Sequence, residues 1–154
     1  MRVELKQPAL EIRLAGKVKE SGMNTKTIRQ TITFKTSPHE VYEALMDSKK
    51  HSEFTGSRAV ISRKVEGKFT AFDGYSEGVN LELVPDKKIV QTWRAADWQN
   101  GHYSQVTFSL KEVNGVTKLS FTQTGVPEEH YDEISQGWRD FYWTPMKKML
   151  NKEI

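Results

Sequence analysis

The sequence contains no cysteine, and this absence excludes disulfide bonds, thiolate nucleophiles and cysteine-ligated metals. Long apolar runs are also missing, because no stretch approaches the roughly 18 residues that a membrane-spanning helix needs. Residues 1–24 interrupt every short apolar run with charge and lack the apolar centre of a secretory signal. We therefore expect a cytoplasmic protein without a membrane span.

Histidine is scarce, and its distribution does not indicate a metal site. The four histidines are His39, His51, His102 and His130, and no two of them have the spacing of metal ligands on one helix turn. The sequence also lacks a Ser-His-Asp arrangement, a phosphate loop and a dinucleotide fingerprint. It therefore predicts no metal, no cofactor and no catalytic residue.

Charge of one sign is not concentrated anywhere along the chain. The 23 basic and 20 acidic residues leave a formal net charge of +3, and the lysine pairs are scattered. A nucleic-acid-binding protein would gather its basic residues on one element, so no nucleic-acid partner is expected. With 154 residues and 36% hydrophobic content, the chain suits a single domain with a sizeable core.

Alternation of apolar and polar side chains predicts most of the chain to be β-structure. In the first run Ile28, Ile32 and Phe34 share one face, at the period of two that a half-buried strand shows. Further strands are expected near residues 59–61, 69–71, 79–83, 89–93, 102–112 and 116–124. The turns between them are marked by Glu66-Gly67, Asp73-Gly74, Pro85-Asp86 and Asn114-Gly115. Loops this short predict one antiparallel sheet of about seven strands.

Two short helices are expected between the first two strands. Ser37 has the hydroxyl of an N-cap, and Pro38 follows it at the first helical position. This helix should run from Pro38 to about Asp47. A second short helix should end near Gly56, with Phe54 as its buried anchor.

The last helix is expected from Gly137 to about Asn151 and is unusually apolar. One stripe of it should contain Trp138, Phe141, Tyr142, Pro145, Met146 and Met149. An apolar arc this broad indicates a helix that is gripped by a curved sheet, and Pro145 should kink it. The acidic residues that follow Pro127 are expected near a helix start, where they offset the macrodipole.

This order of elements resembles the helix-grip fold of the START, birch-pollen-allergen and polyketide-cyclase superfamily, an α+β fold. The segments TSPHEVYEALMDS, EGKFTAFDG, LELVPDKKIVQTWR, WQNGHYSQVTFSL, FTQTGVP and GWRDFYW, taken in this order, resemble one family within it. That family is the C-terminal domain of activators of the 90-kDa heat-shock chaperone ATPase. The resemblance assigns residues 25–154 to the helix-grip domain.

The resemblance implies a function in binding rather than in covalent chemistry. Stand-alone relatives hold a small apolar molecule between sheet and helix, whereas eukaryotic activators use a separate N-terminal domain to dock on the chaperone. Residues 1–24 are too few for that domain, so we expect an arm or extra strand that packs on the sheet edge or on a second copy, as a homodimer would. Fold alone does not decide between a ligand-binding module and a co-chaperone.

The predicted ligand-binding residues are mostly aromatic, because rings line small-molecule pockets as well as cores. They are Phe54, Phe69, Phe72, Tyr75, Leu81, Trp93, Phe108, Trp138, Tyr142 and Met146. Their guest would be a small apolar or aromatic molecule. A cyclase-like enzyme is a third alternative, which would use a carboxylate such as Asp73, Glu77 or Glu82 facing the cavity.

The segment WQNGH should form a loop at the end of the sheet. Trp98, Asn100 and His102 in this loop are candidates for protein contact, for instance with a chaperone. An exposed tryptophan there would equally suit a lid over the pocket.

Overall fold

The computed structural model describes residues 23–151, and the arm predicted for residues 1–24 therefore lies outside this part except for its last two residues. Within residues 23–151, no helix has the length and apolar character needed to cross a membrane. The element order of this part is one strand, two short helices, six strands and a long helical segment.

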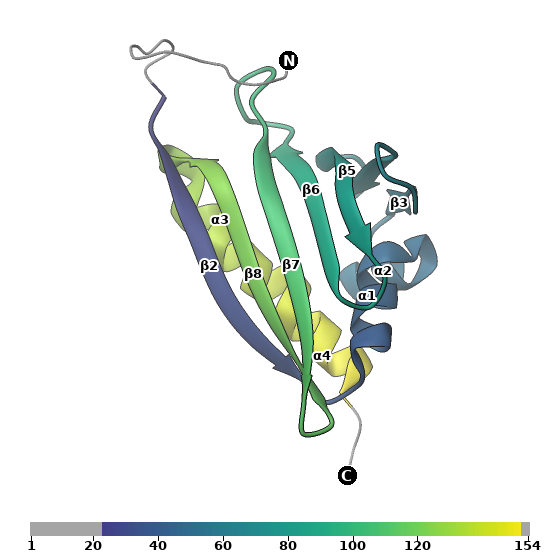
Figure 1. The fold of residues 1–154 in the computed structure, drawn as a ribbon. Helices are drawn as coiled ribbons and strands as arrows, with labels where there is room; N and C mark the ends of the chain where they lie inside the picture. Colours follow the sequence, from purple (N-terminus) through teal and green to yellow (C-terminus); the bar gives the residue numbers. More distant parts are fainter. Residues whose placement is uncertain (1–22, 152–154) are drawn as a thin grey trace.

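A seven-stranded antiparallel sheet forms most of the domain, as predicted (Figure 1). Its strands are β2 (Thr25–Phe34), β3 (Val60–Ile61), β4 (Lys68–Ala71), β5 (Ser76–Val84), β6 (Lys88–Ala95), β7 (Ser104–Val113) and β8 (Val116–Pro127). They lie in the order β2-β8-β7-β6-β5-β4-β3. Strands β3 to β8 each pair with the strand that follows in the sequence, as in a meander, and β2 pairs with β8 at one edge of the sheet.

The tight turns between the strands depend on residues in the left-handed backbone region. At the β7–β8 turn Asn114 has a φ of 52° and Gly115 a φ of 83°. Glu66, Asp73 and Asp86 have φ values of 70°, 56° and 65° in the three other predicted turns. These values confirm the turn positions expected from the sequence, and all of these residues except Glu66 are types that adopt this region at low cost.

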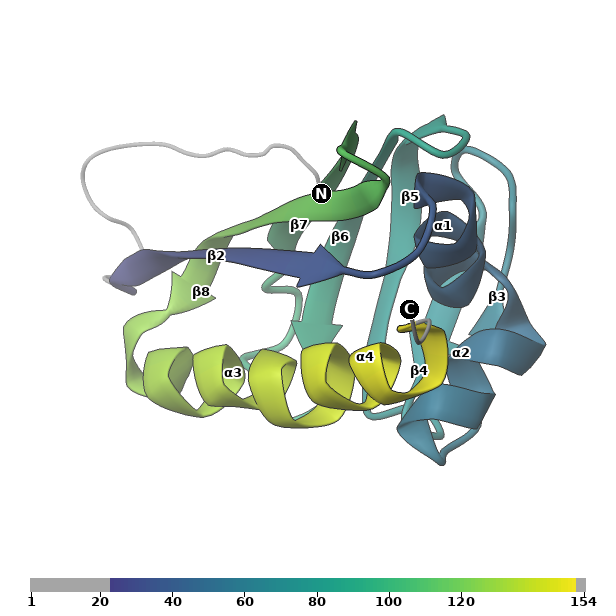
Figure 2. The same ribbon diagram turned by 90° about the horizontal axis from the view of Figure 1, so that it is seen from below.

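Helices α1 (Pro38–Met46) and α2 (Ser48–Thr55) follow β2 and have the predicted ends. The Ser37 hydroxyl accepts a hydrogen bond from the Glu40 amide at 3.3 Å, so the N-cap is present. Gly56, with a φ of 72°, ends α2 in the left-handed conformation. Both helices close one end of the curved sheet (Figure 2).

The C-terminal helical segment runs along the inside of the sheet (Figure 2). It consists of η1 (Glu128–His130), α3 (Tyr131–Trp138), η2 (Arg139–Trp143) and α4 (Thr144–Leu150). The helix start expected after Pro127 and the helix expected from Gly137 are therefore parts of one continuous segment. In η2 the Thr144 amide donates to the Arg139 carbonyl, which is the i→i+5 bond of a π-helical turn. The wide turn immediately precedes Pro145, which lacks an amide of its own and crowds the preceding turn.

The π-helical turn also corrects the predicted apolar stripe. Phe141 was expected on the buried face with Trp138 and Tyr142, but its side chain is 58% exposed. A π-helical turn has more residues than an α-helical turn, so the residues on the same face as Trp138 are those four and five positions later. The residue three positions later, Phe141, leaves this face. Tyr142 and Trp143 are therefore both buried, and Phe141 is turned toward the surface.

Strand β5 differs from its predicted alternation. Leu81 was expected to face inward but is 43% exposed, whereas Gly78 and Asn80 are buried. The register between β5 and β6 shifts between Asn80 and Glu82, which leaves Leu81 as the extra residue of a β-bulge. Before the bulge the even-numbered residues of β5 face the core, and after it the odd-numbered Leu83 does. Val79, which precedes the bulge, does not pack against the core.

Gly78 is required by the close approach of β6. A Cβ atom at this position would overlap the carbonyl oxygen of Thr92. We predict that Gly78→Ala lowers the free energy of unfolding by about 2 kcal/mol, because the backbone of β6 must move away. Chemical denaturation measures this change. Glu77→Ala on the same strand should stay within about 0.5 kcal/mol of the parent, and equal losses in both variants would contradict the packing described here.

Candidate functional site

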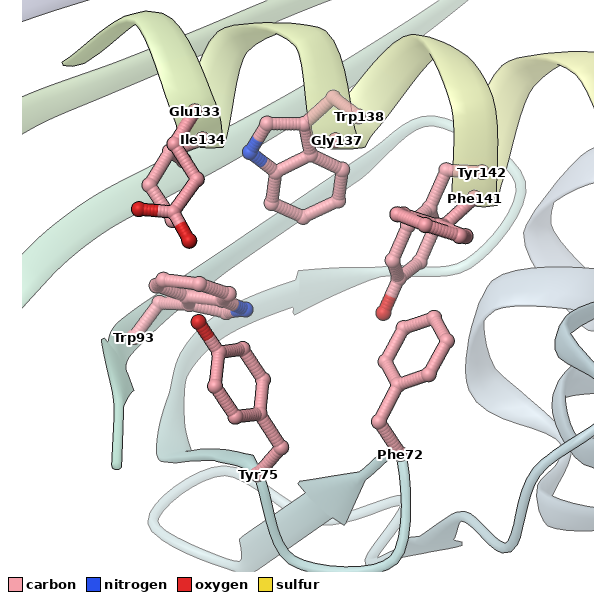
Figure 3. A pocket seen from close by; sticks show the side chains of 9 residues that line it. All are labelled: Phe72, Tyr75, Trp93, Glu133, Ile134, Gly137, Trp138, Phe141 and Tyr142. Atoms are coloured by element: carbon pink, nitrogen blue, oxygen red, sulfur yellow. The ribbon is translucent and has the colours of Figure 1, made fainter. Parts of the chain in front are cut away.

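A pocket of about 280 Å³ lies between the C-terminal helical segment and the β4–β6 side of the sheet (Figure 3). It is lined by Phe72, Tyr75, Trp93, Glu133, Ile134, Gly137, Trp138, Phe141 and Tyr142. It reaches the surface, because Tyr75 and Phe141 are 39% and 58% exposed. Glu133 is the one charged residue of this lining, so the walls are almost entirely apolar or aromatic.

The turn between β4 and β5 supplies the wall that faces the helix. Phe72 has a φ of 52°, which is uncommon for a bulky residue and costs about 1 kcal/mol or more. Backbone bonds from Gly74 to Ala71 at 3.2 Å and from Tyr75 to Phe72 at 3.1 Å hold the turn. This turn therefore presents Phe72 and Tyr75 to the pocket at some cost in backbone strain.

Gly137 leaves the helix side of the pocket without a side chain at one position of the lining. A Cβ atom built on it would meet only the Phe141 ring, at 3.9 Å, which is ordinary van der Waals contact. Glycine inside a helix is less favourable than alanine by roughly 0.5–1 kcal/mol. The helix thus has free volume in front of Gly137, and a larger side chain there would enter the pocket.

Trp138 anchors the helix to the sheet beside the pocket. Its Nε1 donates to Gln123 Oε1 at 2.7 Å, and Gln123 Nε2 donates to Ser104 Oγ at 2.9 Å. The Ser104 hydroxyl in turn donates to the Trp93 carbonyl at 2.7 Å. Because these side chains are buried, the bonds fix the orientation of Trp138 against β6, β7 and β8.

Tyr142, which lines the pocket, forms a buried polar pair with His51. His51 Nδ1 lies 3.1 Å from the Leu45 carbonyl, which only accepts, so Nδ1 carries the proton. Nε2 is then the acceptor for the Tyr142 hydroxyl at 3.0 Å. Burial lowers the pKa of His51 to about 4 and raises the pKa of Tyr142, so both groups stay neutral.

Trp93 brings a hydrogen-bond donor that has no partner. Its side chain is 6% exposed, and within residues 23–151 its Nε1 is one of the few buried polar atoms without a hydrogen bond. In Figure 3 the nitrogen-bearing edge of its indole is turned toward the middle of the lining residues. Such an atom costs about 1–3 kcal/mol when it is left unmet.

The pocket contains half of the predicted ligand-binding residues, namely Phe72, Tyr75, Trp93, Trp138 and Tyr142. Phe69 and Phe108 instead line a second space of only about 10 Å³ behind Trp93. Phe54 and Met146 are buried in the core, and the exposed Leu81 lies away from the pocket lining.

The predicted protein-contact loop is only partly at the surface. Trp98 is 3% exposed, contrary to the expectation of an exposed tryptophan, because it packs against Trp93 with ring centroids 5.3 Å apart. His102 is half-buried and donates from Nε2 to the Gly125 carbonyl at 2.7 Å. Asn100 is exposed.

The carboxylates considered for acid–base chemistry do not line the pocket. Glu82 is exposed and pairs with Lys88 at 3.3 Å, and Glu77 pairs with Arg94 at 3.5 Å. Asp73 lies exposed in the turn that carries Phe72. The cyclase-like alternative therefore loses the three carboxylates named for it, and Glu133 is the carboxylate that the pocket lining does contain.

Sequence reasoning missed Glu133, Ile134 and Gly137 as lining residues because it selected candidates mainly for their aromatic side chains. The signal is present, since residues 133, 137 and 141 and residues 134, 138 and 142 each recur at the helical spacing of four. Asp97, His130 and Glu133 also bring potential ligand atoms within 4.8 Å of one another beside the pocket, a group that the search for histidine pairs did not detect.

The curved antiparallel sheet closed over a C-terminal helix defines a helix-grip fold of the START and birch-pollen-allergen type. Residues 35–151 match the family described as "Activator of Hsp90 ATPase homolog 1-like protein", and the chain belongs to this family. The chain is 36% identical over 117 residues to the activator of 90 kDa heat shock protein ATPase homolog of Dictyostelium discoideum. It is 33% identical over 129 residues to homolog 1 of Homo sapiens.

These relatives are much longer than the matched region. The matches cover 75% and 82% of this chain but only 30% and 38% of the Dictyostelium and human proteins. Among solved structures, an HSP90 activator from Plasmodium falciparum superposes with a TM-score of 0.76 at 26% identity, over 83% of this chain and 96% of that chain. The Aha1 dimer from Colwellia psychrerythraea superposes with a TM-score of 0.71 at 19% identity, over 82% of this chain and 96% of that chain, and shows the shared fold.

His51 should make the stability of the domain depend on pH. The pKa of an unfolded histidine is about 6.5, whereas that of folded His51 is about 4. Between these values the unfolded chain takes up a proton that the folded chain does not, so stability falls as the pH drops from about 6.5 to 4, by about 3 kcal/mol.

The comparison variant is His51→Gln, which keeps polar atoms at the site but does not titrate. Its urea-unfolding free energy should change less than that of the parent between these pH values. His102, whose pKa is also lowered, chiefly by burial, is present in both proteins and cancels in the difference. Equal pH slopes would show that His51 is not buried as a neutral group.

Proposed function

We propose that the domain is a non-enzymatic module that binds a small apolar or aromatic molecule in the pocket between the sheet and the C-terminal helix. The observation that carries this proposal is the pocket of about 280 Å³ whose walls are mainly aromatic. Small-molecule sites are concave and apolar with a few polar groups, and this pocket has both features.

The size of the pocket limits the guest. Its volume of about 280 Å³ is close to the lower end of the range of about 300–1,000 Å³ that small-molecule pockets show. A molecule of one or two rings suits this space. The rings of Phe72, Trp93 and Trp138 would contact it, and the polar pair of Tyr142 and His51 needs nothing from it because both groups already have partners.

A test of this proposal is to fill the pocket from Gly137. Gly137→Leu should abolish binding of phenethyl alcohol, a neutral aromatic probe, because the new side chain occupies the volume in front of the helix. Stability should stay level or rise, since the substitution removes a glycine from a helix. Ligand-observed NMR measures binding, and thermal unfolding measures stability.

Gln136→Leu is the matched control, because it adds the same side chain at the exposed neighbouring position of α3. It should leave probe binding unchanged. If the parent protein fails to bind the probe, or if Gly137→Leu binds it as the parent does, the pocket is not the binding site and the proposal is wrong.

A second candidate is a co-chaperone function, which family membership favours. The relatives named activators of the 90-kDa heat-shock protein ATPase match this chain over about a third of their own length. The activity of the whole relative would come to this domain only if the matched region suffices for contact. Stimulated ATP turnover on mixing with the chaperone supports this function, and unchanged turnover at saturating domain concentration opposes it.

A further inference from the structure

The pocket carries negative charge at one edge. Glu133 lines it, and a carboxylate oxygen of Asp97, a ring nitrogen of His130 and a carboxylate oxygen of Glu133 all lie within 4.8 Å of one another. Tyr75 also belongs to the lining. Burial, followed by the negative charges of Asp97 and Glu133, raises the pKa of Tyr75.

Positive charge does not balance this edge. The lining contains no lysine or arginine, and within residues 23–151 Asp97 and Glu133 form no ion pair with either residue type. Arg94 is engaged by Glu77 at 3.5 Å and by the Trp98 carbonyl at 2.8 Å. His130 lies 3.5 Å from Glu133 and 3.8 Å from Glu129, so even a protonated His130 is outnumbered by carboxylates.

We propose that the pocket selects a small aromatic amine, with its ring between Phe72, Trp93 and Trp138 and its protonated nitrogen at Glu133 and Asp97. This inference rests on the proposed function and names its ligand class. An ammonium group at this edge meets the carboxylates of Glu133 and Asp97. An organic acid of the same shape meets like charge.

The test compares three probes that share a phenyl ring and a two-carbon linker. They are phenethylamine, phenethyl alcohol and hydrocinnamate, which are cationic, neutral and anionic at pH 7.5. Calorimetric titration in low salt, with EDTA to keep metal ions away from Asp97, His130 and Glu133, gives the dissociation constants. We expect phenethylamine to bind about fivefold more tightly than the alcohol, and hydrocinnamate to bind about fivefold more weakly, for charges near a protein surface.

Glu133→Gln should reduce the preference for the amine over the alcohol to about twofold, because it removes the nearer carboxylate without changing the shape of the side chain. Glu129→Gln is the matched control. Glu129 lies four residues earlier and is highly exposed but does not line the pocket, so this variant should keep the fivefold preference. Salt at 0.5 M should weaken the preference in the parent.

The outcomes separate this inference from the function on which it rests. If the alcohol binds but the amine is not preferred, the pocket binds aromatic molecules and the amine proposal is overturned. The same conclusion follows if Glu129→Gln and Glu133→Gln reduce the preference equally. If none of the three probes binds, the proposed function itself fails.

Discussion

The buried hydrogen bond between Trp138 Nε1 and Gln123 Oε1 sets the distance between helix and sheet on which the pocket depends. At 2.7 Å it joins the middle of the helical segment to β8, and the Gln123 amide continues through Ser104 to the Trp93 carbonyl on β6. A buried amide that lost this partner would be left unsatisfied, at about 1–3 kcal/mol. The helix is therefore held in one orientation, while the interior beside Trp138 stays unfilled.

The pocket arises because small and constrained residues stand where large ones would close it. Gly137 adds no side chain to the helix side of the pocket. On the opposite side, Phe72 lines the pocket from a turn in which its own backbone is in the left-handed region. Both features weaken the isolated element, through helix propensity in one case and backbone strain in the other. Their coincidence on facing walls favours binding over core filling as the reason for the open volume.

Much of the fold could be predicted from local chemistry, and the errors have local causes. The Ser37 cap and the Asn114-Gly115 turn were predictable because each depends on a few neighbouring residues. The inward phase of β5 was not, because the bulge at Leu81 interrupts the alternation without any marker in the sequence. The exposure of Phe141 follows from a π-helical turn that a period of 3.6 does not anticipate.

The candidate site was half predictable for the same reason. Aromatic residues such as Trp93 and Trp138 were found by residue type, whereas Gly137 is recognisable only from the space that it leaves.

The central claim is that this space accepts an apolar guest. A crystal of the protein under xenon pressure tests it most directly, because xenon enters apolar cavities. The account predicts a xenon peak bounded by Phe72, Trp93 and Gly137. Well-ordered side chains filling that volume, with no xenon between them, would contradict it.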